Sequence, residues 1–284
     1  MKIGFIGAGK VGVSLGKYFK DFGENISGYY SKSYSSALFA SEFTNTSAFS
    51  QLCEVLKESD MILITVPDSQ IKTVWENIKK CGCDLTGKII CHTSGSVSSG
   101  IFDGARDTGA YAFSVHPLQA ISDKTNSVSL LKGAVFTIEG SKEKIQFVSS
   151  FIKKFGNTVS VIDEKDKTLY HAAAVFVSNL PAALCDMGEK MLIRCGFERE
   201  NARKALAPLI EGAAKNIAEK GAVNALTGPV ERGDCETVLN HLKVLDGKEK
   251  SIYLDLTDIL ISVAEEKNPE RDYTELKNLI KSEG

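Results

Sequence analysis

The chain has 284 residues, of which 43% are hydrophobic and 25% are charged, with 24 glycines and 6 prolines. This composition is typical of a folded globular protein and excludes collagen-like, disordered and coiled-coil chains. Lys and Arg number 34 against 36 Asp and Glu, and the formal net charge of -2 provides no broad positive field. We therefore expect a small-molecule partner rather than nucleic acid or a membrane. The length is sufficient for two domains, and we expect two.

The seven cysteines are scattered along the chain at positions 53, 81, 83, 91, 185, 195 and 235. An odd number of cysteines in a chain of this size indicates reduced thiols and a cytoplasmic location. Cys81 and Cys83 are too close in sequence for a zinc knuckle and have no matching second pair, so we expect no metal. Lys10 and Lys17 interrupt the first apolar stretch, which argues against a signal peptide, and we expect no window with the ~18 apolar residues of a membrane span.

The first half of the chain alternates short β-branched runs with amphipathic segments. The strands are predicted over 2–6, 25–30, 61–66, 88–92, 110–115, 134–139 and 158–162. Continuous apolar runs, such as 61–66, are typical of strands that are covered on both faces. The pattern predicts an α/β domain over 1–162 with a mostly parallel sheet of the Rossmann type.

From Asp163 onward the spacing of apolar residues becomes helical. Helices are predicted over 164–194, 198–219, 235–246, 249–266 and 272–283, so that 163–284 forms an all-helical domain. One apolar stripe of the first helix consists of Leu169, Phe176, Leu180, Leu184, Met187 and Met191. Pro181 should kink or break this helix near Leu180.

A glycine-rich turn is the strongest motif. It follows the first predicted strand, opens a helix and matches G-x-G-x-x-G with Gly7, Ala8, Gly9, Lys10, Val11 and Gly12. In a dinucleotide-binding turn the first glycine allows the tight turn, the second lets the backbone approach a pyrophosphate, and the third allows close packing of helix on strand. The free N–H groups of the helix then face the anion. The alternative is a glycine-rich turn without a ligand.

The end of the second predicted strand distinguishes the two nicotinamide cofactors. An NAD enzyme would place a carboxylate there to bind the ribose 2′-hydroxyl. This chain instead has Ser31, Lys32 and Ser33, with no carboxylate between Glu24 and Glu42. Hydroxyl and ammonium groups can donate to a 2′-phosphate, so the sequence predicts NADP. The alternative is a solvated loop.

Polar groups follow three further strands at the edge where open α/β sheets bind ligands. We expect cofactor contacts from Val66, Pro67, Asp68, Thr93, Ser94 and Gly95. Asp68 is first of all a predicted helix N-cap. His116 is a candidate for contact with substrate or nicotinamide, and Gln119 is a candidate substrate contact. His92 is predicted to be a structural residue.

The helical half must supply part of the substrate site, because reduction of a carbonyl or imine needs a proton or a positive group at the nascent anion. Lys167, His171 and Ser178 share one face of the first long helix, and Asn179 lies beside it. The apolar run between His171 and Ser178 leads us to expect burial on several sides. Lys167 and His171, with His116, are the predicted catalytic groups, and Ser178 and Asn179 are predicted to bind substrate. The alternative is a solvated first turn and a core histidine.

A Gly/Pro-rich loop between two predicted helices provides one more candidate. Arg232 in this loop could bind a substrate carboxylate through two parallel hydrogen bonds. It could equally pair with Asp234 and only shape the loop.

Several motifs together resemble one family. They are Gly-Ala-Gly-Lys-Val-Gly, Ser-Lys-Ser, His-Thr-Ser-Gly, His-Pro-Leu-Gln, Tyr170–Ala174, the stretch from Ala225 through Leu-Thr-Gly-Pro to Asp234, and His241-Leu242. The chain resembles, over nearly its whole length, the two-domain Rossmann-like NADP oxidoreductases whose C-terminal half is a domain of unknown function. More distantly it is similar to pyrroline-5-carboxylate reductase, ketopantoate reductase and the β-hydroxyacid dehydrogenases.

The resemblance implies an NADP site on Gly7, Gly9, Gly12, Ser31 and Lys32, and a helical domain that dimerises. In two of the distant groups a catalytic lysine is followed four residues later by Asn. Here Lys167 is followed by His171, which leaves the proton donor undecided between the two.

The leading hypothesis is an NADPH-dependent oxidoreductase that transfers hydride to a small carbonyl or imine metabolite at an interdomain cleft, acting as a homodimer. A dinucleotide-binding sensor without turnover is the rival from another class. A deazaflavin-dependent NADP oxidoreductase is a further variant.

Overall fold

The computed structural model describes all 284 residues and divides them into two compact units, Met1–Asn179 and Leu180–Gly284. The strands end at Val161, close to the predicted end of the α/β part. Helix α6 (Lys167–Ser178), predicted to open the helical domain after residue 162, belongs with the sheet instead. The two units are described separately below.

The first unit is built on one sheet with the strand order β3-β2-β1-β4-β5-β6-β7-β8. All neighbouring strands are parallel except the antiparallel pair β6 and β7, which confirms the predicted α/β class. The strands are β1 (Lys2–Ile6), β2 (Asn25–Tyr30), β3 (Ser47–Phe49), β4 (Met61–Ile64), β5 (Ile89–His92), β6 (Tyr111–Pro117), β7 (Phe136–Gly140) and β8 (Val159–Val161). The sequence pattern missed β3.

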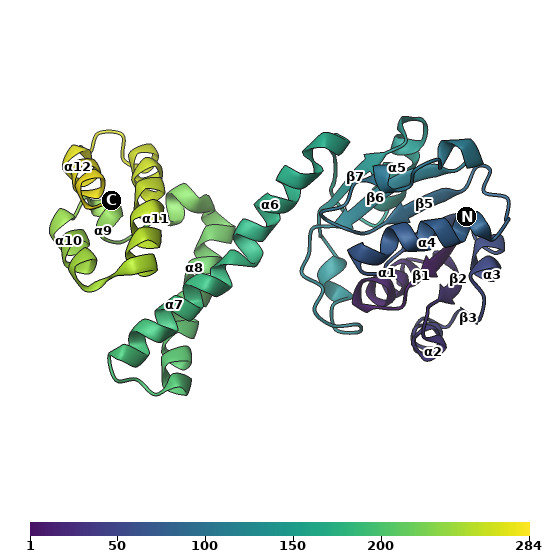
Figure 1. The fold of residues 1–284 in the computed structure, drawn as a ribbon, viewed down its shortest axis with the longest axis horizontal. Helices are drawn as coiled ribbons and strands as arrows, with labels where there is room; N and C mark the ends of the chain where they lie inside the picture. The colour runs from purple at the N-terminus through teal and green to yellow at the C-terminus, as the bar shows by residue number, and fades with distance from the viewer. The chain divides into compact units, whose positions relative to one another are not determined.

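Helices cover both faces of this sheet (Figure 1). On one face pack α1 (Lys10–Asp21), α2 (Tyr34–Thr44) and α5 (Ile145–Lys153), and on the other pack α3 (Leu52–Lys57) and α4 (Asp68–Lys80). Strand β4 shows why its sequence is continuously apolar: Met61 and Leu63 join the first core, whereas Ile62 and Ile64 join the second. Short 3₁₀ turns cover Ser99–Ile101, Arg106–Thr108, Ser129–Leu131, Lys142–Lys144 and Glu164–Asp166.

The second unit is entirely helical, as predicted. It consists of α7 (Leu180–Arg194), α8 (Arg199–Ala225), α9 (Pro229–Arg232), α10 (Cys235–Val244), α11 (Gly247–Lys267) and α12 (Thr274–Glu283). Its core, shared by α9 to α12, includes Val238, Leu242, Ile261 and Tyr273. Helix α8 is interrupted at Gly221, whose φ of 75° is outside the helical region.

Helix α6 ends at Ser178, and Asn179 separates it from α7, so the predicted break near Pro181 is confirmed. The predicted burial of this helix on several sides is wrong, because Lys167 is the only buried residue of α6. Its apolar side chains Leu169, Phe176 and Val177 are 74%, 68% and 80% exposed. The run Glu164–Arg194 is long and apolar enough to cross a membrane. Its most apolar 18-residue window has a mean hydropathy of 1.3, and none of that window is buried. It is an exception to the expected lack of such a window.

Candidate functional site

The glycine turn lies at the point where the strand order of the sheet reverses. Strand β1 is flanked by β2 on one side and β4 on the other, which is where open α/β sheets bind ligands. Gly7 has a φ of 107°, and a Cβ there would lie 2.8 Å from the carbonyl oxygen of Thr65. A Cβ at Gly12 would lie 2.7 Å from the carbonyl oxygen of Gly7 and would overlap the Thr65 hydroxyl. Both glycines are therefore required by the packing of the turn itself.

Gly9 differs from these two glycines because the fold does not require it. A Cβ at Gly9 would meet nothing closer than the Thr65 carbonyl oxygen at 3.9 Å. Gly9 is the N-cap of α1 and makes no side-chain cap, so the first N–H groups of this helix are free. The open space in front of Gly9 fits an anion that approaches the backbone closely.

The loop after β2 carries the residues predicted to choose the cofactor. Ser33 is the N-cap of α2, and its hydroxyl lies 2.8 Å from that of Ser35. Lys32 is exposed and Ser31 is half-buried, and neither side chain forms an ion pair or hydrogen bond within the chain. The loop therefore offers a free ammonium and hydroxyl groups at the carboxyl end of β2.

The loops after β4 and β5 are joined by hydrogen bonds. Asp68 is the first residue of α4 and not its N-cap, which corrects the sequence prediction, because Pro67 takes the N-cap position. The Asp68 carboxylate accepts hydrogen bonds from the hydroxyls of Ser94 and Ser96, each at 2.7 Å. These bonds hold the loop that contains Thr93, Ser94 and Gly95 beside the segment from Val66 to Asp68.

His92 is structural, as the sequence favoured. It is fully buried, and its two ring nitrogens lie 3.1 Å from the Ser98 carbonyl oxygen and 3.2 Å from the Ser94 backbone nitrogen. Burial lowers the pKa of His92 to about 4, so the ring is neutral.

Two cross-strand pairs form the floor of the site on one face of β6 and β7. Ser114 is opposite Glu139, and His116 is opposite Thr137. Residues two apart in a strand point to the same face, so all four side chains project together. The N-terminal part of α6 packs on this surface.

Lys167, at the start of α6, contacts the first pair. It is 1% exposed, and its Nζ donates a hydrogen bond of 2.6 Å to the Ser114 hydroxyl. Burial lowers the pKa of Lys167 to about 8, and the negative charges of Glu139 and Asp68 act against this shift. Glu139 is 1% exposed and accepts hydrogen bonds from the backbone nitrogen and hydroxyl of Ser99, at 2.8 and 2.6 Å. Burial raises the pKa of Glu139, and the bonds from Ser99 oppose that rise.

Tyr170, one turn further along α6, contacts the second pair. Its hydroxyl lies 2.7 Å from Nδ1 of His116. Burial, reinforced by the charge of Lys167, lowers the pKa of His116 to about 4. Burial also raises the pKa of Tyr170, while a hydrogen bond from Thr137 opposes that rise. At neutral pH the site therefore holds a neutral imidazole beside a protonated phenol.

His171 completes this group. A Cβ on Gly95 would lie 2.9 Å from Cδ2 of His171 and 3.0 Å from Nε2 of His116, so both rings face the same backbone segment. Only glycine leaves room for the two rings here.

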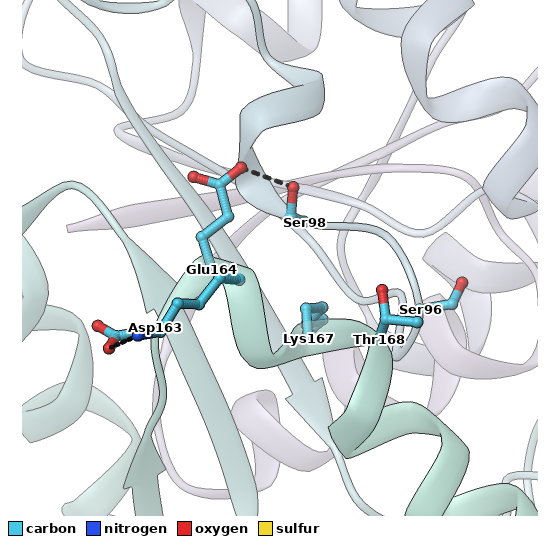
Figure 2. Close-up of a pocket in the computed structure, with 7 residues that line it drawn as sticks. Ser96, Ser98, Asp163, Glu164, Lys167 and Thr168 are labelled. Atoms are coloured by element: carbon cyan, nitrogen blue, oxygen red, sulfur yellow. Dashed lines mark hydrogen bonds and ion pairs between the residues drawn. The ribbon is translucent and has the colours of Figure 1, made fainter.

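Two cavities adjoin these residues. One of about 450 Å³ has apolar walls from Leu118 and α6, and its polar lining contains the predicted residues His116, Gln119, His171, Ser178 and Asn179, together with Tyr170. The other, of about 640 Å³, is lined by Ser96, Ser98, Asp163, Glu164, Lys165, Lys167 and Thr168. Figure 2 shows Lys167 beside Thr168 and a hydrogen bond from the Ser98 hydroxyl to the Glu164 carboxylate, which is 2.8 Å long.

Sequence reasoning did not select Ser114, Glu139, Tyr170 or Thr65 as site residues. A carboxylate in the run 134–139, which is apolar apart from Thr137, was an available signal for Glu139, because a buried charge requires partners. Ser114 is two residues before His116 in the same strand, which predicts a shared face. Thr65 had no such signal.

Arg232 lies in the second unit, in α9. Its guanidinium is 3.9 Å from the Asp234 carboxylate, and the two side chains are 59% and 32% exposed. The pairing with Asp234 that the sequence offered as the alternative is therefore present, and a role in binding substrate remains a prediction.

Comparison with known proteins agrees with this architecture. Residues 1–117 match the Rossmann-like domain, and residues 134–259 match a domain of unknown function, DUF2520. None of the curated proteins matches the chain.

Three solved structures illustrate the shared fold. Protein TM1727 from Thermotoga maritima is 24% identical, with a TM-score of 0.74 over 93% of this chain and 99% of that chain. A pyrroline-5-carboxylate reductase from Coxiella burnetii is 16% identical, with a TM-score of 0.60 over 93% and 97%. An imine reductase from Myxococcus stipitatus, solved with NADP+, is 16% identical, with a TM-score of 0.59 over 94% and 93%.

Proposed function

We propose that this chain, a Rossmann-like domain followed by DUF2520, is an NADPH-dependent oxidoreductase that reduces a small carbonyl or imine compound. One observation supports this proposal above the others. The edge of the sheet that carries the dinucleotide turn at Gly7–Gly12 also carries a cavity lined by His116, Tyr170 and His171. A hydride donor and proton-donating groups are the two requirements of such a reduction.

The dinucleotide would lie on the glycine turn, with its pyrophosphate in the open space before Gly9. The adenosine ribose would reach the loop at Ser31, Lys32 and Ser33, where the absence of a carboxylate favours a 2′-phosphate. The joined loops at Val66–Asp68 and Thr93–Gly95 would contact the nicotinamide half. NADP in a structural relative with the same fold supports this choice.

A titration of the purified protein with NADPH and NADH, followed by nucleotide fluorescence, tests the cofactor. We expect NADPH to bind more tightly, and Lys32→Ala to weaken NADPH by about tenfold while leaving NADH unchanged, which corresponds to about 1.4 kcal/mol. Lys80→Ala is the matched control, because Lys80 is exposed at the end of α4, away from the carboxyl ends of the strands. Equal or tighter binding of NADH by the unmodified protein would refute the 2′-phosphate assignment.

Bound NADPH would supply a hydride to the acceptor carbon. The chain must then hold the acceptor and neutralise the charge that forms on its oxygen or nitrogen. His116 and His171 face the 450 Å³ cavity and would donate hydrogen bonds there, and Gln119, Ser178 and Asn179 would orient the acceptor. Lys167 would contribute a buried positive charge beneath them, held in place by Ser114.

A panel of 2-keto acids, cyclic imines and deazaflavin tests the reaction through loss of the absorbance of reduced nicotinamide. We expect turnover of a carbonyl or imine compound and a loss of about 10²-fold or more in kcat for His116→Ala. Turnover of deazaflavin alone would assign the deazaflavin-dependent variant. NADPH binding without turnover of any compound, and unaltered in His171→Ala, would favour the sensor.

We also propose that the protein is a homodimer. The exposed apolar side chains of α6, with Leu209 and Ile217 of α8 at 68% and 52% exposure, are more than a solvated surface usually carries. A second copy would cover them. Light scattering after gel filtration should give twice the chain mass, and Phe176→Asp with Val177→Asp should give the monomer. A monomeric unmodified protein would refute this.

The cytoplasm is the proposed location. All seven cysteines are unpaired, which is consistent with a reducing compartment. Recovery of the tagged protein from the soluble fraction of its native cell is the corresponding test, and recovery with the membranes would contradict it.

A further inference from the structure

A neutral imidazole such as that of His116 cannot by itself donate a proton to the acceptor and also remain neutral. Its position in the cavity suits a proton donor, but a neutral ring that gives up its only N–H proton becomes an imidazolate, a strongly unfavourable product in water. The proton given from one ring nitrogen must therefore be replaced at the other. The side chain in contact with that other nitrogen is Tyr170.

We propose that Tyr170 is the proton source of the reduction and that His116 relays its proton to the acceptor. This inference rests on the proposed function, because it assigns a role within the same cavity. The phenol oxygen lies 2.7 Å from Nδ1 of His116. In the relay the phenol O–H donates to Nδ1, and the ring hydrogen is then on Nε2. Nε2 makes no hydrogen bond within the chain and lies at the Gly95 side of the ring, beside His171.

The step balances without a further reactant. Hydride adds to the acceptor carbon, and the π electrons of the C=O or C=N bond move to the heteroatom. The heteroatom takes the Nε2 proton of His116, and Nδ1 takes the phenol proton, so that the ring stays neutral. Tyr170 is left as a phenolate, which solvent water then protonates.

Burial raises the pKa of Tyr170 and so disfavours its phenolate, and two neighbouring groups act against this effect. Thr137, cross-strand from His116, can donate a hydrogen bond to the phenol oxygen. The ammonium of Lys167 lies 5.5 Å from the centre of the Tyr170 ring and is within range to stabilise negative charge on it. Lys167 therefore acts on Tyr170 from the same helix, one turn before it.

The chain contains a matched control for this pair. In the second unit, Nδ1 of His241 lies 2.8 Å from the hydroxyl of Tyr253, with ring centres 5.7 Å apart, as they are for His116 and Tyr170. None of the residues that line the proposed substrate cavity belongs to this second pair. Tyr253→Phe thus removes the same hydrogen bond outside the proposed site.

Nitrogen-15 NMR of the histidine side chains tests the resting geometry without any turnover. We expect His116 in the neutral form with hydrogen on Nε2, and Tyr170→Phe to change the Nδ1 signal of that ring alone. Tyr253→Phe should change only His241. A His116 ring with hydrogen on Nδ1 in the unmodified protein would overturn the proposal.

Kinetics with a compound from the substrate panel tests the chemistry. We expect Tyr170→Phe to lower kcat by about 10²-fold, with little change in KM and none in NADPH affinity. The control Tyr253→Phe should have the rates of the unmodified protein. The solvent isotope effect should indicate two moving protons in the unmodified protein and one in Tyr170→Phe. Full kcat in a folded Tyr170→Phe would refute the relay while leaving the reductase assignment standing. If Tyr170→Phe does not fold, His116→Gln, which cannot relay a proton, should show the same loss, and full activity there would refute the relay.

Discussion

Lys167 provides the sharpest quantitative test of the site, because it is an ammonium buried in the fold and its native pKa is about 8. In the unfolded chain the ordinary lysine pKa of 10.5 applies. Below pH 8 both states carry the charge, and the folded protein bears the full cost of burying it. Between pH 8 and 10.5 the native lysine loses its proton while the unfolded one keeps it. The stability of the protein should therefore rise with pH in this window.

The size of the effect follows from the same two values. Each unit of pKa difference corresponds to roughly 1.4 kcal/mol. From pH 7 to pH 10 the linkage relation gives a gain of about 2 to 3 kcal/mol in the free energy of unfolding from Lys167 alone. Lys167→Met keeps the length of the side chain and removes the charge, so this gain should be missing in the variant.

Urea unfolding at several pH values between 7 and 10 provides the measurement. Trp75, the only tryptophan, is fully buried in the first unit, and its fluorescence reports on the unit that contains Lys167. The quantity of interest is the difference in unfolding free energy between the unmodified protein and Lys167→Met, because titrating groups far from Lys167 contribute equally to both proteins and cancel. Lys165→Met is the control, because Lys165 is 78% exposed two residues earlier.

Glu139 requires one further comparison. Substitution of Lys167 leaves the Glu139 carboxylate without its neighbouring cation. The same pair of proteins should therefore also be measured in a Glu139→Gln background. A difference between Lys167→Met and the unmodified protein that stays constant from pH 7 to 10 in both backgrounds would refute the argument that an ionised lysine is buried here.

Three further predictions concern single contacts. Gly9→Ala should weaken NADPH binding with little loss of stability, whereas Gly12→Ala, whose Cβ would overlap Thr65, should cost about 1 to 3 kcal/mol in urea unfolding; equal stability of the two variants would contradict this contrast. Glu139→Gln should lower the pKa of Lys167 further, because the carboxylate favours the ammonium form, and the rise of stability with pH should begin at a lower pH; an unchanged onset would mean that the two side chains do not interact. Arg232→Ala should change stability by less than about 1 kcal/mol, because its ion pair with Asp234 is long and exposed. A large rise in KM would therefore indicate that Arg232 contacts substrate, and an unchanged KM would exclude that role.

The sequence predicted the strands and helices because their hydrophobic patterns are local. Every strand was found except β3, whose sequence Ser-Ala-Phe has no β-branched residue, whereas the equally short β8 lies in a β-branched run. The glycine turn was equally clear, because its spacing and its place after a strand are both visible in the sequence.

The contacts of the site could be predicted only in part. His116 and Lys167 were selected as polar residues at a sheet edge and on a helix face. Their partners were not, because the pairing of Ser114 with Glu139 depends on the antiparallel register of β6 and β7. That register is set by the packing of the whole sheet, and a one-residue slip would turn Glu139 to the opposite face.

Helix α6 shows the limit of periodicity as a guide to burial. Spacing correctly placed Lys167 and His171 on one face and Leu169 and Phe176 on another, but it does not state which face is covered. In this chain the polar face packs on the sheet and the apolar face is exposed, the reverse of a surface helix in a soluble monomer. Burial of a large apolar side chain is worth about 1.5 to 3 kcal/mol, so the exposed face forgoes several kcal/mol in a single chain. The charge at Lys167 fixes one face of α6 to the site, and the other face is then available for the second copy that we propose.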